Sequence, residues 1–484
     1  MDKYFESNRS ILVSDYRIII QARNKKGNYV NKEVIKSGTI EKPESILDLG
    51  FRHTEQIEII QKIQDNILSL QSSYLRAEII SCPICGNQLA KNGATKSTFN
   101  SVFTDHKVAV QKLVCCKCRW MSVPSVDSLF GTHMHPDLVK MQCEVAAVES
   151  YSNAEDILNK KSAKKRTVNN TMTLHKVVEK VGNYISNNPE LHIPDNIKSA
   201  DELVAQTDGG HLKTSEEGKR SFEALTSVIY RPDNVHNKGK DNRGAITGKH
   251  CAASALDDSL HKIIQSTLAA AKKEGLTGKT RIIALCDGAD NCWNVINSLE
   301  EHCAGIERIL DWFHITMKFK NIAVSELNKD LFERAKWSIW HGDLVGAAFK
   351  LTELFGKTKK TKDKKRILKL RNYLINNYDK ITNYSERKRD GLIFTSNMAE
   401  ATVETLINRR CKGKPHMKWS RDGVHPLLQI RAEIESNDWC MNYENYILGA
   451  HAKTASFTQI IYASYYSFEQ ALRLSRTIYN TSHY

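Results

Sequence analysis

Two aspartates lie where carboxylates often bind a metal ion, directly after an apolar run and directly before a glycine. Asp208 follows residues 203–207 (LVAQT), and Asp287 follows residues 282–286 (IIALC). Each run predicts a buried strand that ends at its acid, although Asp-Gly is also a common turn sequence. If the strands are neighbours in one sheet, the two carboxylates meet at one edge and repel each other unless a divalent cation separates them. Carboxylate oxygens suit Mg²⁺ or Mn²⁺.

A third acid is expected from a later helix, and the best candidate is Glu400. The pair Asn397 and Glu400 also forms a capping box, which would make Glu400 a residue that starts the helix. The two roles are compatible, because a glutamate in the first turn can also face a metal. Glu404 lies one turn later on the same face. We prefer Glu400 because it is nearer to the helix start, where the sheet edge is expected to be closest.

Four cysteines have the spacing of a structural metal site. Cys82 and Cys85 form one C-x-x-C pair, and Cys115 and Cys118 form another about thirty residues later. Each pair can present two thiolates to one tetrahedral ion, which predicts a zinc ribbon. Four thiolates leave no open coordination position, so this Zn²⁺ would be structural. Cys116, inside the second pair, is the spare cysteine, and we expect it to be a buried small side chain. The less favoured alternative is that Cys116 replaces Cys115 as a ligand.

The net charge of the chain indicates the class of molecule that it binds. The chain has 484 residues and a formal net charge of +15, and a surplus of this size favours a polyanionic partner, either nucleic acid or an acidic membrane surface. No apolar run approaches the roughly 18–20 residues that a membrane span requires. The first residues are charged throughout and lack the apolar segment of a signal peptide. We therefore expect no membrane insertion and a cytoplasmic, nucleoid-associated location.

Helices are expected to follow the cysteine segment. Three apolar periodicities, at residues 136–150, 154–158 and 167–181, predict short helices with a basic run before the third. This pattern favours a helix-turn-helix whose recognition helix covers residues 166–181, although a small bundle with a solvated charged face has the same periodicity. The candidate DNA contacts in this segment are Lys164, Lys165, Arg166, Asn169 and Asn170.

The remaining chain predicts an α/β domain. Strands are expected at residues 203–207, 222–230, 245–256, 282–286 and 306–310, with helices between the later ones, whereas residues 315–390 read as purely helical. The expected organisation is an N-terminal region at residues 1–75, a zinc ribbon at 76–125, a helical DNA-binding segment at 130–190, a catalytic domain at 200–440 with a helical insertion at about 320–390, and a C-terminal tail at 441–484.

From the ribbon to about residue 431 the sequence resembles the DDE transposases of bacterial insertion sequences. The most specific matches are TDGG at residues 207–210, CDGADNCW at 286–293, ILDWFH at 309–314, and the block from Glu400 to Trp419. The resemblance implies a ribonuclease-H-like mixed sheet and assigns the three metal-binding acids to Asp208, Asp287 and Glu400. Asp311 and His314 match a family signature without an assigned chemical role. The long gap before Glu400 resembles the helical insertion of some transposases.

By this resemblance the protein is a transposase that cleaves and transfers DNA strands at the ends of an insertion sequence. Two Mg²⁺ or Mn²⁺ ions would activate the attacking oxygen and stabilise the leaving oxygen. The expected partner is double-stranded DNA, both element ends and target, bound by a homodimer or larger assembly. Phosphate contacts are expected from Arg409, Arg410 and Lys412. The alternatives are a domesticated transposase that only binds DNA and a nuclease of the same fold.

Overall fold

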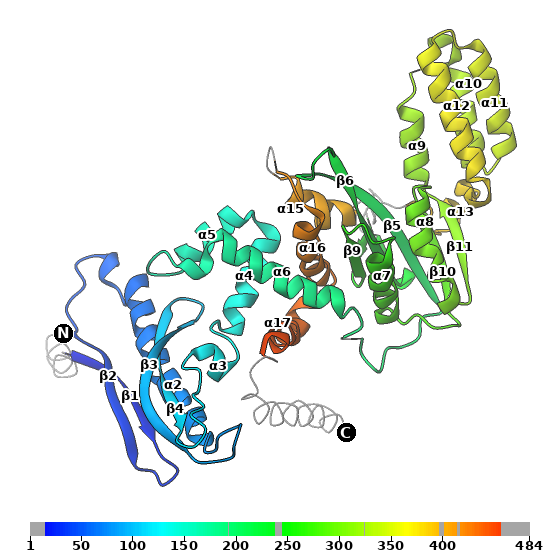
Figure 1. The fold of residues 1–484 in the computed structure, drawn as a ribbon. Coiled ribbons are helices and arrows are strands. Elements are labelled where there is room, and N and C mark those ends of the chain that lie inside the picture. The colour runs from blue at the N-terminus through cyan, green and yellow to red at the C-terminus, as the bar shows by residue number, and fades with distance from the viewer. Residues whose placement is uncertain are drawn as a thin grey trace. The chain divides into compact units, whose positions relative to one another are not determined.

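The computed structural model describes residues 15–191, 193–237, 244–323, 325–395, 401–413 and 417–455, which form two compact units (Figure 1). The N-terminal unit contains the chain up to Ala146, Tyr151–Val177 and the chain from Ile447. The sheet unit contains Ala147–Ser150 and Val178–Tyr446. None of the helices in the described ranges is long and apolar enough to cross a bilayer.

The N-terminal unit begins with two hairpins that flank one long helix. Strands β1 (Asp15–Arg23) and β2 (Tyr29–Thr39) pair antiparallel, as do β3 (Leu89–Asn100) and β4 (Asp105–Cys115). After the 3₁₀ turn η1 (Ile46–Asp48), helix α2 (His53–Glu78) buries Leu68 against Val108 and Val110 of β4. Alternate residues of β4 point inward, the period-2 pattern of a half-buried strand. The short helix α3 (Val126–Phe130) covers the same core.

The helical segment that follows comprises α4 (Pro136–Val148), α5 (Tyr151–Lys160), the 3₁₀ turn η2 (Thr167–Asn169) and α6 (Thr171–Asn187). Ala154, Leu158 and Leu174 form its core. The third helix thus begins later than the predicted residue 166, because Arg166 is extended and Asn170 caps the new helix. The Asn170 side chain accepts a hydrogen bond from the Thr173 amide at 2.7 Å.

The sheet unit is built on one mixed five-stranded sheet in the order β11-β10-β5-β6-β9. β5 (Glu202–Lys213), β6 (Ser221–Tyr230) and β9 (His250–Ser254) are antiparallel, whereas β10 (Arg281–Cys286) and β11 (Gly305–Leu310) run parallel to β5. The single strand predicted at residues 245–256 is two strands, β8 (Gly244–Ile246) and β9. β8 lies outside the five-stranded sheet and pairs with β7 (Val235–Asn237), which follows the 3₁₀ turn η3 (Pro232–Asn234). The α/β class with a mixed sheet is therefore confirmed.

β10 and the first half of β5 are buried on both faces, which explains why residues 203–207 and 282–286 form almost continuous apolar runs. β11 is only partly buried over its first four residues, and its sequence includes Glu307 and Arg308. Helices α7 (His261–Lys273) and α8 (Asp290–Asn297) contribute Ile263, Trp293 and Ile296 to a core with strand residues such as Leu203 and Ile282. The 3₁₀ turn η4 (Glu300–His302) leads into β11.

Beyond the sheet the described chain is helical. The helices are α9 (Trp312–Lys320), α10 (Glu326–Trp340), α11 (Leu344–Lys357), α12 (Thr361–Asn376), the 3₁₀ turn η5 (Tyr378–Lys380) and α13 (Tyr384–Arg389). The π-helix η6 (Glu404–Asn408), α15 (Arg409–Cys411), α16 (Arg421–Glu435) and α17 (Trp439–Ala455) follow. Figure 1 shows α10, α11 and α12 side by side as a bundle.

A buried charge network joins the sheet edge to the start of α17. His250 of β9 lies 2.7 Å from the Glu274 carboxylate through Nδ1 and 3.5 Å from the Asp438 carboxylate through Nε2. Burial lowers the pKa of His250, but the hydrogen bonds to Asp438 and Glu274 outweigh burial and raise that pKa to about 9. His250 is therefore protonated at neutral pH.

Candidate functional site

Asp208 and Asp287 lie at adjacent positions of neighbouring parallel strands. The register pairs Cys286 of β10 with Thr207 of β5, so the residue after each is an aspartate at the same edge. Sequence analysis predicted this juxtaposition and the structure contains it. One detail was wrong: β5 does not end at Asp208 but continues to Lys213, because its second half pairs with β6 alone.

A third side chain joins the two aspartates. One ligand atom each from Asp208, Asp287 and His314 lies within 4.8 Å of the others. His314 is in the first turn of α9, directly after β11, which is the next parallel strand beyond β10. The three residues therefore come from the carboxyl ends of the parallel part of the sheet and from the helix that follows it.

Asp311 holds His314 in place. Its buried carboxylate caps α9 by accepting hydrogen bonds from the amides of Phe313 and His314, and it also accepts the Nδ1 hydrogen of His314 at 2.7 Å. A proton fixed on Nδ1 leaves Nε2 with a lone pair for a metal ion. A carboxylate behind a histidine is the usual support of a histidine metal ligand. The structure therefore gives chemical meaning to the D-x-x-H spacing of residues 311–314.

The electrostatics of this group favour a cation. Burial raises the pKa of Asp208, and the negative charges of Asp287 and Asp311 add to this rise, while the Gly209 amide and His314 lower it. Burial lowers the pKa of His314, but the Asp311 hydrogen bond and the surrounding carboxylates outweigh burial and raise that pKa. Clustered carboxylates of this kind are stabilised by positive charge at their centre.

Glycines beside the acids make room for neighbouring side chains. A Cβ on Gly209 would lie 2.3 Å from a carboxylate oxygen of Glu223. Gly288 has φ +91° and a Cβ there would lie 2.9 Å from the Tyr373 ring of α12. A larger residue at Gly209 would require the Glu223 side chain to move, and one at Gly288 would be strained by the backbone conformation as well as by the Tyr373 ring.

Glu223 is an acid beside the site that sequence reasoning missed. It lies on β6 next to Gly209, and its carboxylate accepts a hydrogen bond from the Asn291 side chain at 2.5 Å. Its local sequence contains no glycine or capping signal, so only the pairing of β5 with β6 reveals its position.

Glu400, the predicted third acid, lies outside the described residues. The described part of its segment packs on β5: Val403 and Ile407 lie within 3.3 Å of the position that a Cβ on Gly210 would take. Glu404 is exposed, accepts a hydrogen bond from the Asn408 side chain at 3.0 Å and lies 3.9 Å from Arg409. In the part of the chain that the structure describes, Glu404 does not belong to the Asp208 group.

The four predicted cysteines form a second cluster. Sγ of Cys82 lies 3.4 Å from that of Cys118, Sγ of Cys85 lies 3.4 Å from that of Cys115, and all four lie within 4.8 Å. Tetrahedral zinc with bonds of about 2.3 Å would separate its sulfurs by about 3.8 Å, so the cluster can bind a metal such as zinc. Hydrogen bonds from Asn87 lower the pKa of Cys85 to about 6, which favours its thiolate.

Cys116 is not part of this cluster. It is exposed between the two clustered cysteines of the second pair, Cys115 and Cys118. It is therefore neither the buried small side chain that we expected nor a member of the group.

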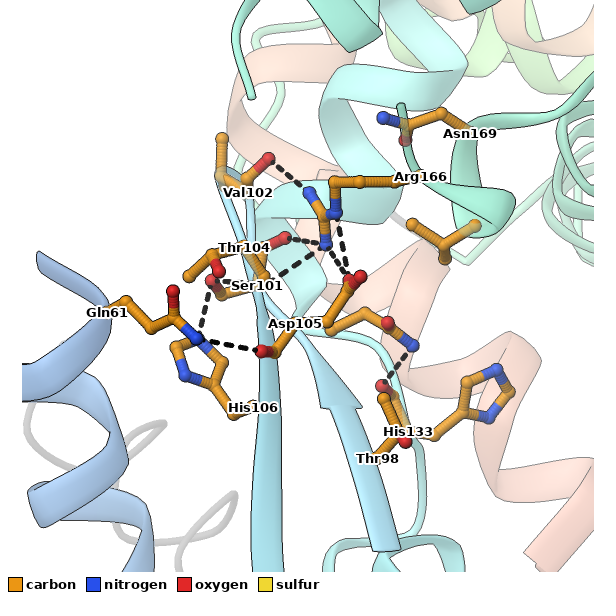
Figure 2. A network of polar contacts seen from close by, with 12 residues as sticks. Gln61, Thr98, Ser101, Val102, Thr104, Asp105, His106, His133, Arg166 and Asn169 are labelled. Atoms are coloured by element: carbon orange, nitrogen blue, oxygen red, sulfur yellow. Dashed lines mark hydrogen bonds and ion pairs between the residues drawn. The ribbon is translucent and has the colours of Figure 1, made fainter. Parts of the chain in front are cut away.

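Arg166 does not have the surface position expected of a DNA contact. Figure 2 shows its guanidinium enclosed by the turn between β3 and β4, where it donates to Asp105 at 2.6 and 2.8 Å. Further hydrogen bonds reach the carbonyls of Val102, Ser101 and Thr104 at 2.8–3.0 Å. Arg166 is 2% exposed. The prediction that Arg166 contacts DNA was wrong, because its guanidinium is buried and paired with Asp105.

Two more predicted DNA contacts have structural roles. Asn169 is 1% exposed and exchanges hydrogen bonds with Gln142 and Asn159, and the Asn170 side chain is occupied as the cap of α6. Lys164 and Lys165 remain exposed, with Lys165 2.8 Å from Glu155. Exposed lysines are thus the phosphate-binding candidates that remain here.

The basic residues before Trp419 likewise include exposed and buried side chains. Arg409 and Lys412 are exposed, whereas Arg410 is buried with its guanidinium carbon 5.2 Å from the centre of the Trp419 ring. The Trp419 amide donates to the Lys213 carbonyl at 3.0 Å, so this block packs at the end of β5. The assignment of Arg410 to DNA is therefore corrected to packing.

One family model matches part of the chain. The model of an uncharacterised protein family, UPF0236, matches residues 277–441. This range contains Asp287, Asp311, His314 and the helical segment, but neither Asp208 nor the cysteine cluster. No curated protein matches the chain.

Proposed function

We propose that this protein is a DDE transposase, which cleaves DNA and joins strands at the ends of an insertion sequence with divalent metal ions. Its catalytic domain would be a ribonuclease-H-like sheet that carries Asp208, Asp287 and Glu400. The observation that carries the proposal is the convergence of Asp208 and Asp287 with His314 at the edge of parallel strands. The net charge of +15 supports a polyanionic substrate.

The residues present suit Mg²⁺ or Mn²⁺. Two carboxylates provide hard oxygen ligands, and the Nε2 atom of His314 adds a nitrogen that Mn²⁺ accepts more readily than Mg²⁺. Bound metal ions would activate the attacking water or 3′-hydroxyl and stabilise the leaving oxygen. Val403 packs against Gly210, two residues beyond Asp208, and Glu400 precedes Val403 by three residues. This spacing supports Glu400 as the third ligand.

The chain's own residues position these groups. Asp311 orients His314 and keeps its proton on Nδ1, while the hydrogen bond from Tyr373 to the Asp287 carbonyl, 2.7 Å long, holds the backbone at the second aspartate. Exposed lysine and arginine side chains would neutralise phosphates. The four-cysteine cluster would bind structural zinc in the N-terminal unit.

The test is a cleavage assay with the full chain and duplexes that contain the DNA flanking its gene, with Mg²⁺ or Mn²⁺. Asp208→Asn and Asp287→Asn are expected to abolish cleavage and to retain DNA binding, whereas His314→Ala should lose more activity with Mn²⁺ than with Mg²⁺, because Mn²⁺ accepts the nitrogen ligand more readily. Asp290→Asn is the matched control, because Asp290 is an exposed acid three residues after Asp287. Hydrolysis without strand transfer would indicate a nuclease, and binding without cleavage a DNA-binding protein; either result would refute the proposal.

A further inference from the structure

Helix α12 (Thr361–Asn376) presents a row of positive charges on one face. Lys362, Lys365, Arg366 and Lys369 occupy positions i, i+3, i+4 and i+7, and all four are exposed. We call these four residues the basic stripe. The apolar residues of α12 that are buried, Ile367, Leu370 and Leu374, lie on the other side of the helix.

Three of the four charges of the basic stripe have no ion-pair partner within the described chain. Lys362, Lys365 and Lys369 form no ion pair with any described residue, whereas Arg366 lies 3.7 Å from Asp363 and keeps 43% of its side chain exposed. Like charges at i, i+4 destabilise a helix by about 0.2–0.5 kcal/mol per pair. A polyanion along the stripe would remove this repulsion.

The basic stripe leads to the metal site. Tyr373 follows Lys369 by four residues on the same face, and its hydroxyl donates to the Asp287 carbonyl at 2.7 Å. Lys318 of α9 places its ammonium 4.2 Å from the centre of the Tyr373 ring, which adds a cation at this end. With a rise of about 1.5 Å per residue, Lys369 lies about 6 Å and Lys362 about 16 Å along the helix axis from Tyr373.

We propose that the basic stripe binds the phosphate backbone of the DNA strand beside the bond that is cut. This inference rests on the proposed function and adds the path of the substrate to it. Phosphates of one strand are spaced by about 3.4 Å along the duplex axis, so the stripe reaches phosphates within about five nucleotides of the metal site. The helical segment before Glu400 is then a substrate-binding element.

The test compares two double variants of the full chain, each in an Asp208→Asn background that prevents cleavage. Lys365→Ala/Lys369→Ala removes two charges of the stripe. The control, Lys198→Ala/Lys279→Ala, removes two exposed lysines of the same unit. These lysines shortly precede the first residues of β5 and β10, at the edge of the sheet away from Asp208 and Asp287. Affinity for a fluorescent 40-base-pair duplex is measured by anisotropy over a range of KCl concentrations.

We expect the stripe variant to bind the duplex more weakly than the Asp208→Asn protein. The slope of log affinity against log salt should be less steep by about 1.8, which is about 0.9 for each of two lost phosphate contacts. The control should keep the slope of the Asp208→Asn protein. Equal slopes and affinities in the two double variants would overturn the inference. The binding measurement needs no cleavage. It therefore tests DNA binding by the basic stripe even if the unsubstituted protein proves inactive and the proposed function fails.

Discussion

Replacing Arg166 by methionine tests whether this residue is structural or contacts DNA. The substitution keeps much of the side-chain volume but removes five hydrogen bonds, two of them to Asp105, and leaves three carbonyls without that donor. Breaking a buried ion pair from one side costs about 3–5 kcal/mol. Because the Asp105 side chain is 26% exposed and can be hydrated, we expect the lower end, about 3 kcal/mol.

The assay is amide hydrogen exchange in the full chain. The amides of Asn100 and Ser101, which bond to the carbonyls of His133 and Thr104, report on the turn that surrounds the guanidinium. A local loss of about 3 kcal/mol should accelerate their exchange by roughly a hundredfold. Lys165→Met is the matched control, because this neighbouring lysine is 77% exposed and should change stability by less than about 1 kcal/mol. Unchanged exchange in Arg166→Met together with weaker DNA binding would refute the structural role.

Three further predictions follow from the two sites and the buried network. Cys82→Ser should lower the zinc content measured by metal analysis from one ion per chain towards none, and an unchanged content would contradict the cluster. Glu400→Gln should abolish cleavage while Glu404→Gln retains it, with the reverse result placing the third ligand one turn later. The stabilisation from His250, whose folded pKa of about 9 exceeds its unfolded value of about 6.5, should be complete below pH 6.5 and lost as pH rises through 9. His250→Asn should flatten this part of the melting-temperature profile, and an equal pH dependence in both proteins would exclude the network as its source.

The sequence determined the features that depend on local spacing. Each C-x-x-C pair places two sulfurs on one turn, and two such pairs predict a shared metal site; the β3–β4 hairpin brings the pairs together, and the structure contains the four-cysteine cluster. The apolar runs before Asp208 and Asp287 likewise predict strands, because such runs are typical of strands buried on both faces. Both strands are present, in one mixed sheet.

Which side chains are accessible, and which of them meet, depends on the packing of the folded chain. Arg166 and Arg410 are indistinguishable in sequence from the exposed Lys164 and Arg409, but packing encloses the former pair and leaves the latter in solvent. His314 joins the aspartates because β11 runs parallel to β10, and Asp208 lies beside Asp287 because β5 pairs with β10 across a long stretch of chain. Strand register and burial depend on contacts among distant residues, whereas local spacing does not, and that is the physical reason for the difference.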